Sequence, residues 1–293
     1  MRNFILGTDW WTDCDDAVAL RLLARFVKEK KINLLGIGIN ACMEYSVASL
    51  KGFLFANGLD RIPIGIDSDA TDLGGSPPYQ KHLADTFCPN GCNGDATDAV
   101  ELYRTVLASC SEPIEIIEIG YLQVLANLLK SPPDAISNKS GLELVREKVS
   151  KFWIMGGKWD ANGERENNFC RTEQTRKASA FFCKACPVPV TFLGWEVGYG
   201  VITGNLLDKS DPLYRVLSDH GSKNGRHSWD PMLVLMALIG NEESAGYRTI
   251  IGHASVDPDT GANYFVPDPA GIHKYVIKNY QNAKYERQIN SLL

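Results

Sequence analysis

The sequence predicts an α/β protein with an open, mostly parallel, doubly wound (Rossmann-like) sheet and helices on both faces. The composition, 44% hydrophobic and 22% charged over 293 residues, is that of a globular protein. Short apolar runs typical of buried strands alternate with amphipathic stretches typical of helices. Such alternation forms right-handed crossovers and a parallel sheet covered on both faces. No linker or internal repeat divides the chain, so we expect one domain, residues 1–293.

Each expected element follows from one of these runs. Strands are expected at Phe4–Leu6, Asn33–Ile39, Ile62–Ile66, Ile114–Ile119, Lys151–Met155 and Val188–Leu193. Helices are expected at Asp15–Val27, Tyr45–Asn57, Thr97–Ser109, Leu122–Leu129, Glu173–Cys183 and Met232–Ile239. The longest stretch without a periodic pattern, residues 67–95, is rich in Gly, Pro, Asp and Asn. Long loops in compact domains are commonly functional lids, so we expect an irregular flap over one end of the sheet.

The charge pattern excludes several classes of partner. Thirty basic and 35 acidic side chains give a net charge of −5, and no basic run is present. We therefore expect neither nucleic acid nor an anionic membrane as a partner. The apolar run before Gly7 has only three residues, too few for a signal peptide, and the apolar run at 232–240 is too short to span a membrane. We expect a soluble, cytoplasmic protein.

The eight cysteines are expected to be free thiols in a reducing compartment. Two pairs have a spacing that metal ligands also use, Cys88/Cys92 and Cys183/Cys186. A structural zinc site needs four ligands, and the only further candidate near either pair is His82. Buried, small apolar residues are the simpler interpretation of the second pair.

The loop after the first expected strand carries most of the acidic chemistry. In parallel α/β sheets, ligands bind at the carboxyl ends of the strands. Four carboxylates lie within eight residues there: Asp9, Asp13, Asp15 and Asp16. Capping of the following helix accounts for one or two of them. Because close carboxylates repel one another unless a cation or a proton intervenes, the loop indicates a metal site.

Later loops after strands add further polar candidates. Asn40 ends the second expected strand, and two glycines after Met155 precede Glu166 and Asn168. A pair of glycines lets a ligand approach the backbone closely. Asp230 precedes Pro231 at the start of an apolar helix. Capping of that helix is the alternative interpretation of Asp230.

Taken in this order, the loops resemble the inosine–uridine nucleoside hydrolase family. That family opens with a strand and Asp-x-Asp-x-Gly-x-Asp-Asp-Ala, which binds calcium and ribose. Here residues 4–9 fit the left half of the motif and residues 15–20 fit the right half. The glycine turn at Gly120, the Met-Gly-Gly and Glu-x-Asn group, and Asp230-Pro231 fall where later family motifs belong. The resemblance spans about residues 4 to 240.

The resemblance implies calcium-dependent hydrolysis of the N-glycosidic bond of ribonucleosides, which yields free base and ribose. The implied calcium ligands are the carboxylates of Asp9, Asp16 and Asp230 and the main-chain carbonyl of Ile119. Asp9 is also expected to take the proton from a metal-bound water. The ribose hydroxyls are assigned to Asp15, Asn40, Glu166 and Asn168. The expected partner is a small nucleoside, bound by a homo-oligomer (dimer or tetramer).

The sequence also departs from the family pattern. Two extra residues separate Asp9 from Asp15, so Asp13 competes for the role of either. Trp229 stands where the best-studied members carry the His thought to protonate the leaving base, which leaves His227 as the nearest candidate acid. Glu196 resembles a motif of a divergent bacterial branch, at the base pocket. Four tryptophans are candidates for stacking on the base: Trp10, Trp11, Trp195 and Trp229.

Two alternatives remain open at this stage. One is a non-catalytic protein of the same fold that binds ribose or nucleosides, which the missing histidine at position 229 favours. The other is a magnesium-dependent aspartyl phosphohydrolase, which also places an Asp after the first strand. That class needs an Asp-x-Asp, which Trp11 breaks, and a strand-end lysine, for which Lys158 is the only candidate.

Overall fold

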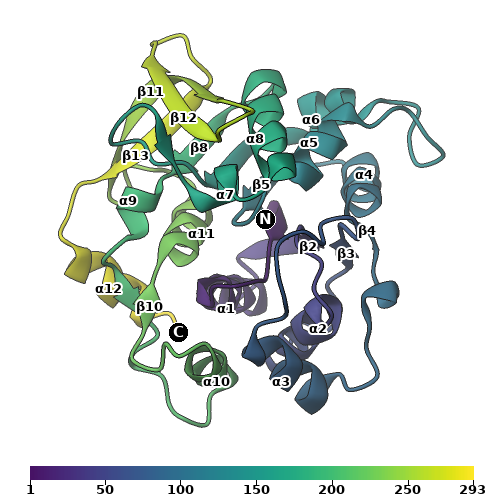
Figure 1. Ribbon diagram of the computed structural model, residues 1–293, viewed down its shortest axis with the longest axis vertical. Helices are drawn as coiled ribbons and strands as arrows, with labels where there is room; N and C mark the ends of the chain where they lie inside the picture. Colours follow the sequence, from purple (N-terminus) through teal and green to yellow (C-terminus); the bar gives the residue numbers. More distant parts are fainter.

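An 11-stranded mixed sheet runs through the computed structural model, which describes residues 1–293 (Figure 1). Its strand order is β4-β3-β2-β1-β5-β6-β8-β13-β11-β12-β7. Neighbours from β4 to β13 in this order pair in parallel, and the last three pairs are antiparallel. A second, two-stranded sheet joins β9 and β10. The expected fold class is confirmed, with an antiparallel extension at one edge.

The strands are β1 Arg2–Thr8, β2 Ile32–Ile39, β3 Ile64–Ile66, β4 Thr97–Asp98, β5 Ile114–Glu118, β6 Val149–Met155, β7 Glu164–Arg165, β8 Val190–Leu193, β9 Ile202–Thr203, β10 Arg226–His227, β11 Tyr247–Val256, β12 Ala262–Pro267 and β13 His273–Lys278. The helices are α1 Asp15–Lys28, α2 Ser46–Ala56, α3 Pro78–Phe87, the 3₁₀ turn η1 Asn93–Asp95, α4 Ala99–Ser109, α5 Gln123–Lys130, α6 Gly141–Lys148, α7 Asn167–Cys170, α8 Glu173–Ala185, α9 Trp195–Gly198, α10 Pro212–Asp219, α11 Trp229–Ile239 and α12 Asn282–Asn290. The expected strands and helices all form, with ends that differ by a few residues. No helix has the length and hydrophobicity that crossing a bilayer requires.

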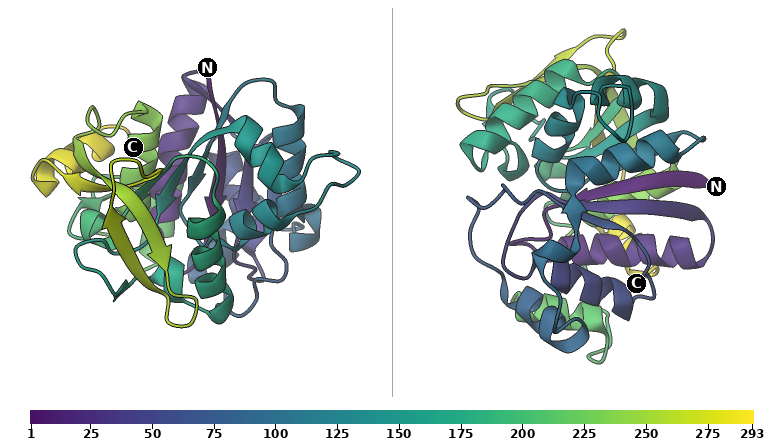
Figure 2. Two further views of the ribbon diagram at one scale, coloured as in Figure 1. Left: turned by 90° about the horizontal axis from the view of Figure 1, so that it is seen from above. Right: turned by 90° about the vertical axis from the view of Figure 1, so that its right-hand side faces the viewer.

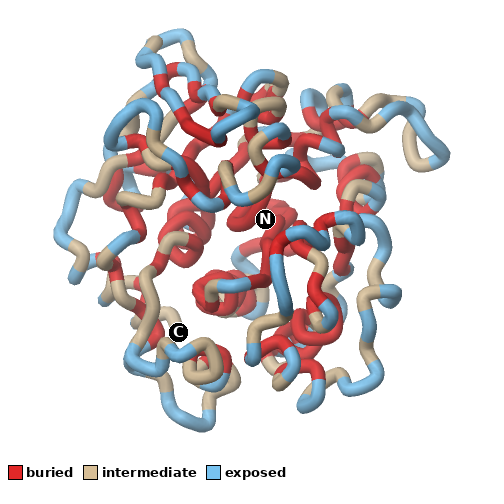
Figure 3. The backbone as a smooth tube through the Cα atoms, in the orientation of Figure 1, coloured by how far each residue is buried: buried red, intermediate tan, exposed pale blue.

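Two apolar cores lie on opposite faces of the sheet. One unites α1, α2, α10 and α11 with β1 and β2, and the other unites α4, α5, α6 and α8 with β5, β6 and β8. Buried residues accordingly gather toward the centre of the molecule, while exposed residues lie mostly toward its periphery (Figure 3). The antiparallel strands β11 and β12 form a hairpin at one end of the molecule (Figure 2). The hydrophobic faces of the helices thus fix them on the sheet, as alternating βα units require.

Residues 67–95 differ from the expected irregular flap. Residues 78–87 form α3, because Pro78 occupies the first helical turn and the apolar side chains of Tyr79, Leu83 and Ala84 are buried. This helix packs against α2. None of residues 67–95 lines the cavity described below. The Gly and Pro content correctly predicted the loops around α3, but it gave no indication of the helix between them.

The sheet reverses its order of connection at β1. Successive strands β2 and β3 extend the sheet on one side of β1, and β5, β6 and β8 extend it on the other. At such a switch point the loops after neighbouring strands diverge and leave a crevice beyond their carboxyl ends. The loop that follows β1 and the turn that follows β5 therefore face a shared space.

Candidate active site

A cavity of about 190 Å³ opens at this switch point. The residues around it come from the loop after β1 and the start of α1, from the ends of β5 and β6, and from the starts of α7, α9 and α11. They are Asp9, Trp11, Thr12, Asp13, Asp15, Asp16, Ile119, Met155, Glu166, Asn167, Asn168, Trp195, Trp229 and Asp230. Most of the polar residues singled out in the sequence thus lie around one cavity.

Three carboxylates form a tight group at this cavity. Asp15 and Asp16 begin α1, and Asp230 lies in the first turn of α11. The two helices pack against each other, so residues more than 200 positions apart become neighbours. Carboxylate oxygens of the three residues lie within 4.8 Å of one another, and all three side chains are buried. The backbone N–H of Asp230 also donates to Asp15 Oδ2 at 3.1 Å.

Burial makes this group costly to ionise. It raises the pKa of Asp15, Asp16 and Asp230 well above the usual range, and the negative charges of the neighbouring carboxylates raise them further. The pKa of Asp9 is raised in the same way, first by burial and then by Asp15 and Asp13. A hard divalent cation would restore the ionised forms, and its preferred ligands are oxygens such as these. The donor set therefore fits calcium or a similar ion.

Asp9 directly follows β1 and lines the cavity beside this group. Its Oδ1 accepts the backbone N–H of Trp11 at 3.1 Å. Asp16 is fixed from the same loop, because its Oδ1 accepts the Thr8 hydroxyl and the backbone N–H of Trp10. The group of three therefore contains Asp15, which the sequence analysis assigned to ribose, and not Asp9. Ile119, whose carbonyl was the fourth implied ligand, lies at the same cavity.

The turn between β1 and α1 is strained. Trp10 has a φ of 48° and Thr12 a φ of 57°, a region that residues other than glycine rarely adopt. A β-branched residue such as Thr12 is especially unfavourable there. Contacts from α3 hold the turn: Tyr79 Oη donates to the carbonyls of Trp10 and Asp13, and Gln80 Nε2 donates to Trp10 O at 2.6 Å. The segment predicted to be a flap thus supports the acidic loop.

Glu166 and Asn168 occupy the opposite wall. Glu166 caps α7, with its two oxygens accepting the backbone N–H groups of Asn168 and Gly157 at 2.9 and 3.0 Å. Burial raises the pKa of Glu166 to about 7. Asn168 Nδ2 donates to the carbonyls of Met155 and Ile119. Both side chains are therefore held rigidly where the sequence analysis expects ribose hydroxyls.

Asn40 is buried below the cavity and does not line it. Its Nδ2 donates to Glu118 Oε1 at 2.8 Å, and its Oδ1 accepts the backbone N–H of Tyr121. Glu118, at the end of β5, also accepts the backbone N–H of Gly120, while its Oε2 has no partner. A Cβ atom on Gly7 would lie 2.0 Å from that Oε2, so only glycine leaves room for it. Burial raises the pKa of Glu118 to about 8.

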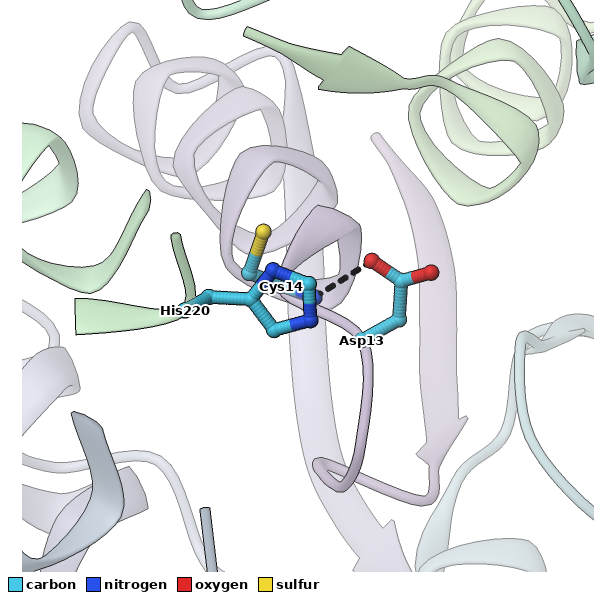
Figure 4. A group of neighbouring side chains, drawn as sticks. All are labelled: Asp13, Cys14 and His220. Carbon is cyan, nitrogen blue, oxygen red and sulfur yellow. Dashed lines mark hydrogen bonds between the residues drawn. The ribbon is translucent and has the colours of Figure 1, made fainter. Parts of the chain in front are cut away.

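Asp13 forms an ion pair at the rim of the cavity. Arg226 Nε and Nη2 donate to its two carboxylate oxygens at 2.8 and 2.6 Å. Asp13, Cys14 and His220 also form a group with metal-ligand atoms close together (Figure 4). Figure 4 shows the Asp13 carboxylate accepting a hydrogen bond from the backbone N–H of Cys14. With Asp13 bound by Arg226 and the pKa of the Cys14 thiol raised by burial, Asp15, Asp16 and Asp230 are the better metal ligands.

Two residues predicted for the leaving base lie outside the cavity lining. His227 Nδ1 accepts the backbone N–H of Gly200 at 2.9 Å, and its ring stacks on Tyr199. Glu196 accepts the backbone N–H of Trp159, and burial raises its pKa to about 7. The structure thus brings neither side chain to the cavity.

The four tryptophans separate into two groups. Trp11, Trp195 and Trp229 line the cavity, and the rings of the last two are 6.4 Å apart and inclined by 28°. Trp10 is fully buried in the core, where its Nε1 donates to Ser49 Oγ at 2.8 Å. Stacking of Trp10 on a ligand is excluded, because no face of its ring reaches the cavity.

Several residues of the site were missed by the sequence analysis. Thr12 and Asn167 line the cavity, and Glu118 and Arg226 support residues around it. Glu118 could have been found as the acidic residue at the end of an apolar strand, which also carries Glu115. Arg226 carries no signal in the sequence, since its partner Asp13 is 213 positions away.

Together, the sheet and the cavity define an α/β protein with an acidic ligand site at a topological switch point. Comparison with solved structures specifies the fold: the chain has the nucleoside hydrolase fold. It matches a plant nucleoside hydrolase, PpNRh1, with a TM-score of 0.71 and 16% identity over 99% of this chain and 98% of that one. The inosine–uridine preferring nucleoside hydrolase of Bacillus anthracis matches with a TM-score of 0.68 and 14% identity over the whole of both chains.

The same fold occurs in a bacterial effector. The type III effector XopQ, solved in complex with adenosine diphosphate ribose, matches with a TM-score of 0.67 and 14% identity over 99% of this chain and 93% of that one. No protein-family model and no curated protein matches the chain. The resemblance inferred from the sequence is thereby confirmed at the level of the fold.

Proposed function

We propose that the protein is a calcium-dependent hydrolase that cleaves the N-glycosidic bond of ribonucleosides and releases free base and ribose. The observation that carries this proposal is the convergence of Asp15, Asp16 and Asp230 within 4.8 Å beside Asp9. Buried carboxylates at this spacing need a cation to remain ionised. The nucleoside hydrolase fold and the order of the loops support the same activity.

In this proposal three carboxylates bind the ion, and a fourth acts on the water. Asp15, Asp16 and Asp230 hold the cation together with the carbonyl of Ile119. When bound, the cation lowers the pKa of a water molecule and fixes its position. Asp9 acts as the general base that accepts the proton of the attacking water. Its hydrogen bond from the Trp11 N–H keeps the carboxylate oriented toward the cavity.

Glu166 and Asn168 hold the ribose. Cleavage of an N-glycosidic bond develops positive charge on the sugar ring, which the acidic lining of the cavity stabilises. Hydroxyl contacts that tighten as the ring flattens contribute several kcal/mol in related glycoside chemistry. Both side chains are buried and held by backbone contacts, so little ordering is needed when the sugar binds.

A reducing-sugar assay over a panel of nucleosides, with calcium or with a chelator, tests the proposal. We expect ribose release that the chelator abolishes and calcium restores. Asp9→Asn should lower kcat by at least about a hundredfold, the lower range for removal of a general base. Asp259→Asn, which alters an exposed carboxylate that does not line the cavity, is the matched control. An unchanged rate for Asp9→Asn would remove the proposed base.

A binding protein of the same fold is the second candidate. Trp229 in place of a histidine favours it, as does the similar effector solved with adenosine diphosphate ribose. It predicts nucleoside binding by calorimetry without ribose release. A phosphohydrolase would instead release phosphate from phosphate esters. No basic side chain lines the cavity, and Lys158 pairs with Asp160 and Glu164, which disfavours that reaction.

A further inference from the structure

The tryptophans are the aromatic surfaces of the cavity that remain for the base, because the carboxylates serve the ion and the ribose. Trp195 and Trp229 are half-buried, and both line the cavity. The faces of indole rings attract cations. The guanidinium of Arg226 already lies 5.6 Å from the centre of the Trp229 ring. This wall therefore has the chemistry of a site for a flat cation.

The charge of the cavity also favours a cationic ligand. Six acidic side chains line it and no basic one does. Arg226 balances Asp13 at the rim, and one divalent cation balances two further carboxylates. A net negative charge remains when all six are ionised. Such a site attracts a cationic ligand and strengthens its contacts with the tryptophan faces.

The carboxyl groups of the cavity are assigned to the ion, the water and the ribose or, for Asp13, pair with Arg226, and no other side chain of the lining is placed to protonate a leaving base. His227 lies outside the cavity, with Nδ1 accepting the Gly200 N–H. The Trp229 Nε1–H donates to Trp195 O at 2.8 Å. The hydroxyl of Thr12 and the indole N–H of Trp195 are not acids near neutral pH. General acids contribute about a hundredfold or more to such reactions, so a base that needs a proton leaves slowly here.

We propose that the preferred substrates are ribonucleosides with a cationic, N-alkylated heterocycle, such as a 7-alkylpurinium or a pyridinium. This inference rests on the proposed function. The water oxygen bonds to C1′ while the C1′–N bond breaks, and the electron pair returns to the ring nitrogen. That pair cancels the positive charge of the heterocycle, so the base leaves as a neutral molecule with no added proton. The proton of the water passes to Asp9.

A matched pair of substrates tests the inference. Ribose release from 7-methylguanosine and guanosine is measured at pH 6 with saturating calcium, and uridine and inosine are included. We expect kcat/KM to be at least about a hundredfold higher for 7-methylguanosine, the lower range of a missing general acid. A smaller ratio overturns the inference but leaves the proposed function standing if any nucleoside is cleaved.

7-Methylguanosine is also the intrinsically more labile compound. A variant is therefore needed to separate the effect of the site on the rate ratio from the reactivity of the substrate itself. Trp229→His places an imidazole before Asp230 and should raise kcat for guanosine, so that the ratio falls at least about tenfold. An unchanged ratio overturns the inference. If this variant does not fold, Trp195→Leu should raise KM for 7-methylguanosine about tenfold and that for guanosine much less. Equal changes overturn it.

Calorimetry gives a readout that does not need turnover. We expect the calcium-loaded protein to bind 7-methylguanosine about tenfold more tightly than guanosine, as a desolvated cation–π contact allows. Asp9→Asn is used for this measurement, because it should bind without cleaving. Equal affinities overturn the inference. Ribose release from none of the nucleosides, combined with preferential binding of the cation, would contradict the proposed function alone.

Discussion

Calcium should raise the melting temperature of the protein, and the reason lies in the group of three carboxylates. Oxygens within 4.8 Å repel with about 3 kcal/mol per ionised pair at an effective dielectric constant of about 20. Three such pairs approach the net stability of a typical domain. The ion-free protein therefore keeps protons on this group, as the raised pKa values of Asp15, Asp16 and Asp230 indicate.

The sign of the pH dependence follows from that direction. A carboxyl group whose folded pKa is raised stabilises the fold at pH values below its unfolded pKa of about 4. This contribution is lost as the pH rises through the folded pKa. The ion-free protein should therefore melt at lower temperatures as the pH rises from about 5 to 8. Because the proposed calcium ion requires the ionised group, the increase in melting temperature that it produces should grow over the same interval.

Differential scanning calorimetry with calcium or a chelator measures this effect. At a calcium concentration about a hundredfold above Kd, binding contributes about 2.7 kcal/mol. At about 2 °C per kcal/mol for a chain of this size, the melting temperature should rise by about 5 °C. In Asp230→Asn the ion-free protein should melt higher at pH 8 and the calcium effect should vanish. A wild-type melting temperature that does not change with calcium at any pH would refute the reasoning.

Three further predictions concern residues around this group. Because hydroxyl donors bond best to the ionised form of Glu166, whose pKa is about 7, kcat/KM should rise about tenfold from pH 6 to pH 8. Glu166→Gln should flatten this pH–rate profile, and a retained rise would assign it to another group. Thr12→Gly should relieve the positive φ of 57° and raise the melting temperature by about 2 °C, while Thr12→Ala should not. Gly7→Ala should destabilise the fold by about 2 kcal/mol in denaturant titrations, because its Cβ collides with Glu118. The double variant with Glu118→Ala should recover most of that loss, and an additive loss would contradict the steric account.

The parts of the fold with clear periodicity could be predicted from the sequence. The units β1–α1, β2–α2 and β5–α5 each have an apolar run followed by a stretch with a helical pattern, so local patterns were sufficient for them. Helix α3 was not predicted, because the Pro77-Pro78 pair is typical of a loop. Pro78 is nevertheless compatible with a first helical turn. The antiparallel edge from β13 to β7 was missed because its order depends on pairings between strands distant in sequence.

The candidate site could be predicted where a short segment carries several ligands. The acidic loop from Asp9 to Asp16 is such a segment. Asp230 required the resemblance to a family, since its closeness to Asp16 depends on the packing of α1 against α11. Trp10 and Trp11 illustrate the limit of local inference. They are adjacent in sequence, but one ring packs in the core and the other lines the cavity, at a turn where Trp10 has a positive φ.

Gly7 and Glu118 depend on each other in a way that no local sequence pattern reveals. Because Gly7 has no side chain, it leaves the volume that the carboxylate of Glu118 fills from the neighbouring strand β5. Glu118 also accepts hydrogen bonds from Asn40 Nδ2 and from the Gly120 N–H, so it ties the turn after β5 to the base of the cavity. The two positions are 111 residues apart in the sequence, and only the pairing of β1 with β5 joins them.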